Sequence, residues 1–468
     1  MQLDRRDFLA AAAGGLRGAR QQEPPNLLFL MPDQWRAQDL GCMGNRQVRT
    51  PVLDKLASEG VLFTSAVANC PVCTPARGIL LTGRYPHQTG TPVNDVPLRQ
   101  DQPTLAKVLQ KAGYYTGFVG KWHLHGGPRL PGFVPPGPAR QGFEFWAANI
   151  CSHAYFRSQY FRDDPTPIPI PGYDSITWTD LGIEFLEKAR ARKQPFCLYL
   201  QYTPPHDPYL LPPGHEKDYS PEEIQLRPNW REGAKRLGTR KDIAGYYSAI
   251  NFLDSEIGRL LKRLDELGQR DNTIVYFLSD HGDMLGSQGT FLKRKPWEES
   301  TQVPGIFRWP RAIAPGRKLD APFSHIDAVP TLLGLCGIEP PPGLEGFNYA
   351  DYILGKSRRT PDYAMLMIYT KTELNEWDCW RGLRTRRYKY ARFEHKPWVL
   401  YDLKNDPYEL HNLVDSPAHR KLRARFDAII DQHMDRVKDS WKELEDWLPA
   451  QRRAETLQGD DTKAKGRG

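Results

Sequence analysis

Two cysteines three positions apart, Cys70 and Cys73, lie in the segment NCPVCTPARGILLTGRYPH, residues 69–87. A Cys-x-x-Cys pair can be a thioredoxin-like redox couple, in which a helix N-terminus stabilises one thiolate. It can also supply half of a zinc site. The zinc alternative lacks a second cysteine pair, and the redox alternative lacks the expected strand–helix–strand setting. Neither accounts for Pro75 and Arg77, so a third alternative is a site in which only one sulfur takes part.

Pro75 favours this third alternative on physical grounds. Proline is well accepted in the first turn of a helix, so we expect a helix to begin close to Cys73. The free N–H groups and the dipole of a helix N-terminus attract anions. An anionic group held there would face the side chain of residue 73, which is where a nucleophile would be placed.

Four short apolar runs, each followed by polar residues, predict the elements that position this helix. The runs end at Met31, Val119, Tyr202 and Leu278. The polar residues that follow them are Asp33 and Gln34, Lys121 and His123, His206, and Asp280 and His281. Short, wholly apolar, β-rich runs indicate strands that are buried on both faces of a largely parallel sheet. Ligands gather beyond the carboxyl ends of such strands, so the pattern predicts one active site.

Helical patterns lie between these runs. Residues 104–113 have an N-cap threonine and a closing glycine, and residues 243–268 are amphipathic and also end in glycine. Strands and helices alternate, so we predict an α/β fold with a doubly wound, mostly parallel sheet flanked by helices. After the proline- and glycine-rich segment 337–346 the pattern changes. Residues 380–393 alternate like antiparallel strands, and a charged amphipathic helix is expected from about 417 to 444.

These patterns divide the chain of 468 residues into four segments. We predict an export signal or disordered leader at 1–23 and a catalytic α/β domain at 24–345. A smaller α+β subdomain with an antiparallel sheet is expected at 346–450, and a polar disordered tail at 451–468.

The composition is that of a soluble globular protein, with 40% hydrophobic and 26% charged residues. The formal net charge of +8 favours anionic ligands, and the odd number of cysteines argues against a disulfide framework. Arg5 and Arg6 precede a short apolar stretch, a pattern typical of twin-arginine export signals, so we expect an exported, periplasmic protein. We expect neither a membrane span nor a nucleic-acid partner.

The segment CTPARGILLTG, residues 73–83, resembles the signature of the type I sulfatase family, in which the motif is Cys-x-Pro-x-Arg. Cys73, Pro75 and Arg77 hold the motif positions, and LLTGRYPH matches the usual continuation. The resemblance covers nearly the whole chain and implies an alkaline phosphatase-like fold. In this family the motif cysteine is oxidised after translation to formylglycine, which implies a formylglycine-generating maturation enzyme as a partner.

The resemblance also implies roles for the polar residues at the strand ends. The residues that match metal ligands are Asp33, Gln34, Cys73, Asp280 and His281. The residues that match catalytic or sulfate-binding groups are Cys73, Arg77, Lys121, His123, His206 and Lys293. Mostly oxygen ligands favour Ca²⁺, with Mg²⁺ or Mn²⁺ as alternatives. Gln34 replaces a carboxylate and His281 stands where many members have asparagine, so the site carries less negative charge.

Each of these residues has a structural alternative. Asp33 could cap a helix, Lys121 could be a solvated surface lysine, and His206 could hold a rigid turn between two prolines. These residues match the sulfatase pattern together with Cys73, and this joint match favours the catalytic interpretation. Lys293 is preferred to its two basic neighbours because it lies four residues before a tryptophan.

Two features leave alternatives open. The aromatic-rich stretch 143–161 could stack on sugar rings, or it could pack beneath a loop. Asp283, in the segment SDHGDMLG, is assigned no role.

Taken with the motif, the resemblance implies a sulfuric ester hydrolase that cleaves an O-sulfate ester of a carbohydrate or a small molecule. A hydroxyl of hydrated formylglycine would attack sulfur, while Arg77 and Lys121 neutralise charge. Lys293 or His206 would protonate the leaving alcohol, and His123 would take a proton from the second hydroxyl as sulfate departs. The alternatives are a phosphodiesterase or phosphonate monoester hydrolase of the same superfamily, and a catalytically silent binding or thiol protein.

Overall fold

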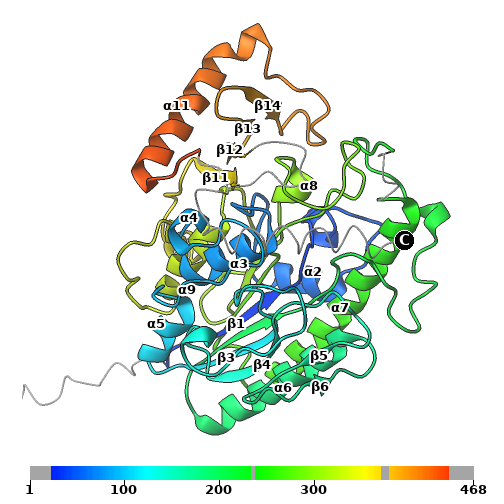
Figure 1. Ribbon diagram of the computed structural model, residues 1–468, viewed down its shortest axis with the longest axis vertical. Coiled ribbons are helices and arrows are strands. Elements are labelled where there is room, and N and C mark those ends of the chain that lie inside the picture. The colour runs from blue at the N-terminus through cyan, green and yellow to red at the C-terminus, as the bar shows by residue number, and fades with distance from the viewer. Residues whose placement is uncertain (1–22, 233–237, 370–378, 442–468) are drawn as a thin grey trace, which may run out of the picture.

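The computed structural model of the chain describes residues 23–232, 238–369 and 379–441 (Figure 1). The predicted leader lies almost entirely outside these ranges and the predicted tail wholly outside them. The export signal, the periplasmic location and the disordered tail therefore stay predictions. Within the described ranges, no helix combines the length and the apolar character that crossing a membrane requires.

An eight-stranded sheet forms the centre of the larger part of the molecule. Its strands in chain order are β1 (Asn26–Met31), β2 (Val61–Phe63), β3 (Tyr115–Lys121), β4 (Phe145–Asn149), β7 (Phe196–Gln201), β8 (Thr273–Leu278), β9 (Gly305–Arg308) and β10 (Arg317–Leu319). Their spatial order is β10-β2-β9-β8-β1-β7-β3-β4. Neighbours pair in parallel, except that β9 is antiparallel to β2 and β8. The predicted mostly parallel sheet is confirmed.

The apolar runs form strands that are covered on both faces, as β1 illustrates. Leu27 and Phe29 belong to the core cluster on one face of the sheet, whereas Leu28 and Leu30 belong to the cluster on the other face. Helices that contribute to the first cluster are α3 (Cys73–Thr82), α5 (Leu105–Lys111) and α9 (Ala328–Leu335). Helices that contribute to the second are α2 (Pro51–Ser58), α6 (Asp174–Arg192) and α7 (Arg240–Glu266) (Figure 1). Two covered faces define the predicted doubly wound α/β fold.

Three predicted boundaries can be compared with the structure. The α5 helix is capped as predicted, because the Thr104 hydroxyl accepts a hydrogen bond from the Lys107 N–H. The α7 helix starts at Arg240, earlier than predicted, because Thr239 and Asp242 form a capping box in front of it. The β3 strand continues past Val119 to Lys121, since it keeps its pairing with β4.

A four-stranded antiparallel sheet forms the C-terminal part of the structure. Its strands are β11 (Tyr363–Ile368), β12 (Trp380–Thr385), β13 (Tyr388–Arg392) and β14 (Pro397–Asp402). The α11 helix (Arg420–Val437) packs on it through Phe426 and Ile430 (Figure 1). The antiparallel prediction is confirmed. The helix is shorter than predicted, because Lys438 turns into the left-handed conformation and ends it.

The remaining α-helices and strands of the described residues are short. They are α4 (Pro86–Thr89), α8 (Glu298–Thr301), α10 (Ala350–Ile353) and the β5–β6 hairpin (Gln159–Tyr160 and Ile168–Pro169). The boundaries that we placed at residues 345 and 450 remain predictions.

Candidate active site

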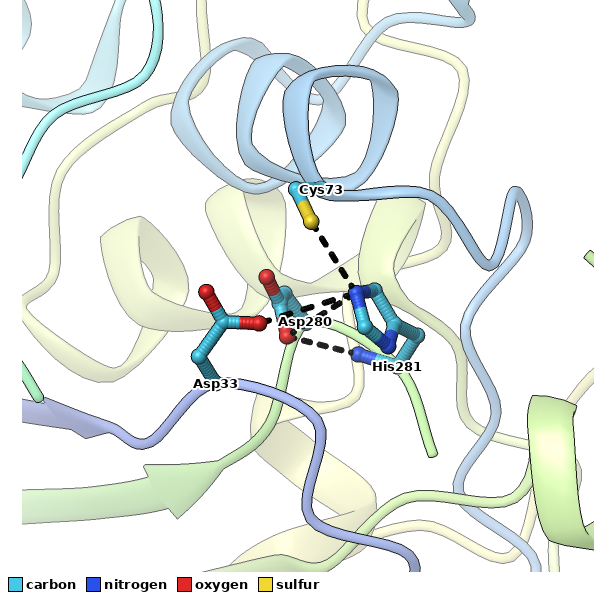
Figure 2. Close-up of side chains that lie close together, drawn as sticks. All are labelled: Asp33, Cys73, Asp280 and His281. Atoms are coloured by element: carbon cyan, nitrogen blue, oxygen red, sulfur yellow. Dashed lines mark hydrogen bonds and ion pairs between the residues drawn. The ribbon is translucent and has the colours of Figure 1, made fainter. Parts of the chain in front are cut away.

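Cys73 occupies the first position of α3, where the sequence placed the nucleophile. The preceding Val72 is extended, Pro75 lies in the first turn, and the whole helix is buried. The Thr74 N–H donates to the side-chain oxygen of Asn94 at 2.9 Å, which satisfies one of the open helical N–H groups. The sulfur of Cys73 points from the helix start toward residues that follow the sheet strands (Figure 2).

Four side chains of ligand type meet at this point (Figure 2). The donor atoms of Asp33, Cys73, Asp280 and His281 all lie within 4.8 Å of one another, and all four residues are buried. Asp33 follows β1, whereas Asp280 and His281 follow β8, the parallel neighbour of β1. His281 Nε2 lies 3.2 Å from Cys73 Sγ and 3.7 Å from a carboxylate oxygen of each aspartate. The fold thus joins residues from separate strand ends into one cluster.

These residues fit a divalent cation. Asp33 Oδ1 is buried and has no hydrogen-bond partner among the described residues. The carbonyl of Gly282 lies 3.0 Å from His281 Nδ1. A carbonyl can only accept, so Nδ1 carries the proton and the lone pair of Nε2 faces the cluster. Two carboxylates and an imidazole are a donor set for a hard or borderline cation.

Arg77 and Lys121 supply positive charge beside the carboxylates. Arg77 Nη2 lies 3.2 Å from Asp33 Oδ2 and 3.0 Å from Asp280 Oδ2. Lys121 Nζ lies 2.5 Å from Asp33 Oδ2. Burial opposes the charge of each group, but the opposite charges prevail. Lys121 and Arg77 hold the pKa of Asp33 well below its usual range, and the carboxylates raise the pKa of both cations.

Lys293 and His206 approach residue 73 from another side. Lys293 Nζ lies 3.2 Å from Cys73 Sγ and 2.9 Å from His206 Nε2, which agrees with the choice of Lys293 over its basic neighbours. His206 Nδ1 lies 2.7 Å from the Asp207 carbonyl, so Nδ1 donates and Nε2 accepts from Lys293. Burial and the charge of Lys293 lower the pKa of His206. His206 is therefore arranged as an acceptor.

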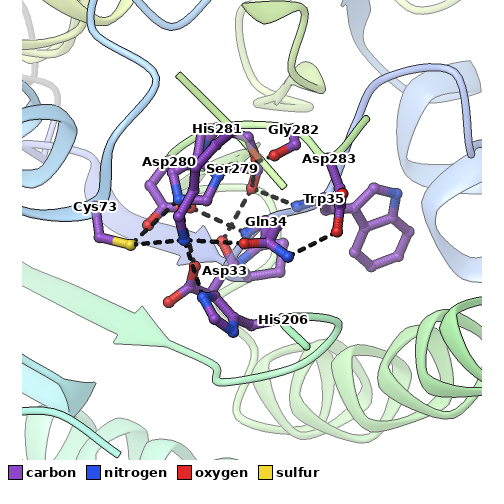
Figure 3. Close-up of polar contacts among 12 residues, drawn as sticks. Asp33, Gln34, Trp35, Cys73, His206, Ser279, Asp280, His281, Gly282 and Asp283 are labelled. Atoms are coloured by element: carbon purple, nitrogen blue, oxygen red, sulfur yellow. Dashed lines mark hydrogen bonds and ion pairs between the residues drawn. The ribbon is translucent and has the colours of Figure 1, made fainter. Parts of the chain in front are cut away.

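The side-chain amide of Gln34 is directed toward Asp283 (Figure 3). Its Nε2 donates to Asp283 Oδ2 at 2.7 Å, and its Oε1 accepts from Lys293 Nζ at 2.9 Å. The Tyr209 hydroxyl donates to the same Asp283 oxygen. Asp283, which had no assigned role, thus orients the Gln34 amide. The role of Gln34 as a metal ligand stays a prediction.

The two cysteines of the opening motif lie in opposite environments. Cys70 packs in an apolar cluster with Val72 and Met284, and burial raises the pKa of its thiol to about 12. Burial acts in the same sense on Cys73, but Lys293, Lys121 and His281 lower the pKa of that thiol well below its usual value. Both cysteines are free thiols, and Cys70 belongs to neither of the ligand-type clusters of the described chain. The geometry favours the alternative in which only one sulfur takes part.

Three residues at the site were missed by the sequence analysis. The side-chain oxygen of Gln201, the last residue of β7, accepts from Arg77. His153 stacks on the His206 ring at 4.0 Å and lies 2.9 Å from Lys121 Nζ. Asp95 lies 3.0 Å from His123. Of these three residues, only Gln201 could have been predicted from the sequence, because it ends an apolar run.

The aromatic-rich stretch 143–161 mainly serves packing. Phe143 and Trp146 belong to the main core cluster and lie beside Phe118 of β3. The packing alternative is therefore confirmed for these two rings. The contribution of this stretch to the site is His153, which is a polar residue.

Known proteins similar to this chain agree with the geometry. The sulfatase family profile matches residues 25–338, and the profile of the N-sulphoglucosamine sulphohydrolase C-terminal region matches residues 286–436. An ulvan-active sulfatase from Formosa agariphila is 36% identical over 92% of this chain and 85% of its own length. An N-acetylglucosamine-6-O-sulfatase from Bacteroides thetaiotaomicron is 27% identical over 89% of this chain and 87% of its own.

Solved structures give the same result. The crystal structure of a yidJ sulfatase candidate from Bacteroides fragilis superposes with a TM-score of 0.83 at 30% identity, over 91% of this chain and 99% of that chain. The chain therefore belongs to the sulfatase family, and it is a sulfatase. A phosphonate monoester hydrolase from Agrobacterium radiobacter superposes with a TM-score of 0.73 at 23% identity, over 88% of this chain and 96% of that one. This second likeness shows the shared alkaline phosphatase-like fold alone.

Proposed function

We propose that the protein hydrolyses O-sulfate esters of a carbohydrate, with a formylglycine at position 73 and a divalent cation beside it. The observation that carries the proposal is the position of residue 73. It lies at a helix N-terminus, between a buried ligand cluster and the ammonium group of Lys293. The names of the ulvan-active and N-acetylglucosamine-6-O-sulfatase relatives support a carbohydrate substrate.

Two groups that the sulfatase family implies complete the site. Hydrated formylglycine would supply the attacking hydroxyl. A bound cation would polarise the sulfate oxygens and neutralise their charge. Asp33, Asp280 and His281 would hold the cation, with Gln34 as a further candidate. Ca²⁺ is our first candidate, and the His281 nitrogen keeps Mn²⁺ as an alternative beside Mg²⁺. Because Cys73 is only 1% exposed, we infer that the maturation enzyme acts before this segment folds.

Four further side chains have roles in the proposed reaction. Arg77 forms short ion pairs with both Asp33 and Asp280 and so offsets part of their negative charge. Lys121 and Lys293 offer ammonium groups to the sulfate oxygens. Because the Nδ1–H of His206 is committed to a carbonyl, His206 orients Lys293 and does not itself donate a proton toward the substrate. Lys293 is then the group that protonates the leaving oxygen.

Parallel rate measurements on matched esters test the proposal. We expect hydrolysis of an aryl sulfate and of sulfated sugars to exceed that of the matching aryl phosphonate and phosphodiester, because we assign both Lys121 and Lys293 to the oxygens of one sulfate group. Lys121→Ala should abolish this preference, whereas Lys111→Ala, an exposed lysine at the end of α5, should leave it unchanged. Faster hydrolysis of the phosphonate by the unsubstituted enzyme would support the rival function.

A screen of sulfated carbohydrates tests the substrate class. Release of sulfate from at least one sulfated sugar, at a rate above that from a simple aryl sulfate, is the expected result. Activity confined to small aryl esters would contradict the carbohydrate assignment and leave the sulfatase activity standing.

A further inference from the structure

A buried carboxylate, Asp95, lies behind His123 and has no part in the roles described so far. Asp95 Oδ1 lies 3.0 Å from His123 Nε2, and their side chains are 5% and 2% exposed. The other oxygen, Oδ2, accepts a hydrogen bond from Arg129 Nε at 2.5 Å. Burial acts against ionisation, but His123 and Arg129 hold the pKa of Asp95 well below its usual range. The pair is therefore a charged hydrogen bond inside the protein.

The backbone around Asp95 ties it to the helix that carries residue 73. The neighbouring Asn94 accepts from the Thr74 N–H of α3, and the Thr74 hydroxyl donates to the His123 carbonyl at 3.0 Å. Two residues further along each segment, Pro97 and His125 form a bridge between the two backbones. The loop, the end of β3 and the start of α3 thus form one hydrogen-bonded unit, which fixes the carboxylate relative to residue 73.

Both partners of this hydrogen bond have an unfavourable backbone conformation. The φ angle is 64° at Asp95 and 55° at His123. Residues other than glycine rarely adopt the left-handed region, and such residues cluster at functional sites because the surrounding structure must hold them there. Two of them joined by one buried bond indicate a functional arrangement.

The bond to Asp95 decides which ring nitrogen of His123 is available. A carboxylate only accepts, so Nε2 carries a proton. Nδ1 is buried and has no hydrogen-bond partner among the described residues. The His123 ring also interacts with the sulfurs of Cys151 and Cys73. Nδ1 is therefore the nitrogen that is left to serve residue 73.

We propose that Asp95 is a positioning residue of this sulfatase, which holds His123 in the orientation and tautomer that direct Nδ1 to residue 73, while Arg129 holds Asp95. The proposal rests on the proposed function for its chemical step. In that step a proton passes from an oxygen of residue 73 to Nδ1, and the Nε2–H stays on His123. Asp95 keeps its negative charge throughout and stabilises the imidazolium that forms.

A direct test is the tautomer of His123 in the full-length chain labelled with ¹⁵N-histidine. The His123 signals are those missing from the spectrum of His123→Gln. Burial opposes the charge of the ring, but Cys151 and Asp95 raise the pKa of His123 to about 10, so the spectra are recorded above that pH, where the ring is neutral. We expect the Nε2 signal in the range of a protonated nitrogen and the Nδ1 signal in that of an unprotonated one. The same pattern is expected in Cys73→Ala, which cannot be oxidised. The reverse pattern, with the proton on Nδ1, would overturn the proposal.

Kinetics of Asp95→Asn supply the second test. An amide can donate to Nε2 and so stabilise the wrong tautomer. We expect kcat to fall by about 10²- to 10⁴-fold, while KM changes by less than about threefold because Asp95 does not touch the substrate. Asp95→Glu, which keeps the charge, should recover part of kcat. The matched control is Asp101→Asn, an exposed aspartate of the same loop, which should leave both constants unchanged.

The outcomes separate this proposal from the proposed function. If the unsubstituted protein fails to hydrolyse sulfate esters, the function fails, and the NMR pattern in Cys73→Ala still decides the role of Asp95. An unchanged kcat in Asp95→Asn would overturn the positioning role. If Asp95→Asn fails to fold, the tautomer of the unsubstituted chain decides the question alone.

Discussion

Two clusters of buried charges in this protein differ in how their atoms are used. The interface cluster, formed by Glu298, Arg384, Lys389 and Glu409, joins α8 to the C-terminal sheet. Lys389 Nζ lies 2.6 Å from Glu298 Oε1 and 3.4 Å from Glu409 Oε1, so one cation bridges two carboxylates. The active-site cluster is equally buried, but there the ligand atoms of Asp33, Cys73, Asp280 and His281 all lie within 4.8 Å of one another.

This difference shows what marks a functional site. Burying charges is costly in either place, and a closed network of opposite charges compensates that cost within the protein. In the interface cluster, the ion pairs of Lys389 and Arg384 with Glu298 and Glu409 provide this compensation. The active-site cluster directs ligand atoms at a common point, and we propose that a bound cation completes its compensation. Convergent atoms, more than perturbed pKa values, therefore distinguish the active site.

The largest expected effect comes from the residue at the centre of the active-site cluster. Cys73→Ala removes the side chain that we propose is oxidised, so kcat/KM on an aryl sulfate should fall by at least about 10⁴-fold. Thermal unfolding should change little, because the substitution removes one atom. Cys70→Ala is the matched control in the apolar cluster and should retain activity. Substantial turnover by Cys73→Ala would show that another residue is the nucleophile.

The interface cluster should respond in the opposite way. Lys389→Met leaves Glu298 and Glu409 without their shared cation, and breaking such a buried network typically costs about 3–5 kcal/mol of unfolding free energy. Denaturant unfolding measures this loss, and KM of the folded enzyme should stay the same. Lys404→Met, at an exposed position, is the control. Equal stability of the two variants would mean that the interface cluster is not a stabilising network.

Removal of the cation should affect only the active-site cluster. Chelation should lower the melting temperature and the activity, and re-addition at about 100 times Kd should restore about 2.7 kcal/mol of stability. Calorimetry with Ca²⁺, Mn²⁺ and Mg²⁺ measures the shift and ranks the three ions. His281→Ala should lose the response, whereas Lys389→Met should keep it. A chelation response that survives in His281→Ala would place the cation elsewhere.

The smallest expected effect is a loss of stability at low pH. Burial acts to raise the pKa of Glu298, but Lys389 and Arg384 hold it at about 2, below the ordinary value of 4.5. A lowered carboxyl pKa contributes stability that is present above pH 4.5 and is lost as pH falls toward 2. Stability should therefore decline in this window, and Glu298→Gln should flatten the decline. Denaturant midpoints measured from pH 6 to 2 would reveal this decline. Parallel curves for the unsubstituted protein and Glu298→Gln would contradict the prediction.

The sequence predicted the parts of the site that lie at the ends of strands or directly after them. Asp33, Lys121 and Asp280 could be placed because parallel strands end at one edge of the sheet, and Cys73 because a proline marks the helix start. Asp95 and His153 could not be found in this way. They lie in loops whose path depends on tertiary contacts, such as the bridge between Pro97 and His125, and no local motif encodes those contacts.

The direction of the Gln34 side chain could not be predicted from the sequence either. Its position after β1 was foreseeable, but the direction of its amide depends on Asp283, which lies on a different strand end and is distant in sequence. The end of α11 was also misplaced, because the helical pattern continues beyond Val437 while the backbone turns at Lys438.

Mass spectrometry of the peptide that contains residue 73, from active protein made in its native host, tests the central claim most directly. We predict an aldehyde at this position, detectable by its reaction with a hydrazide. An intact thiol at residue 73, or a disulfide between Cys70 and Cys73, in protein that hydrolyses sulfate esters would contradict the account.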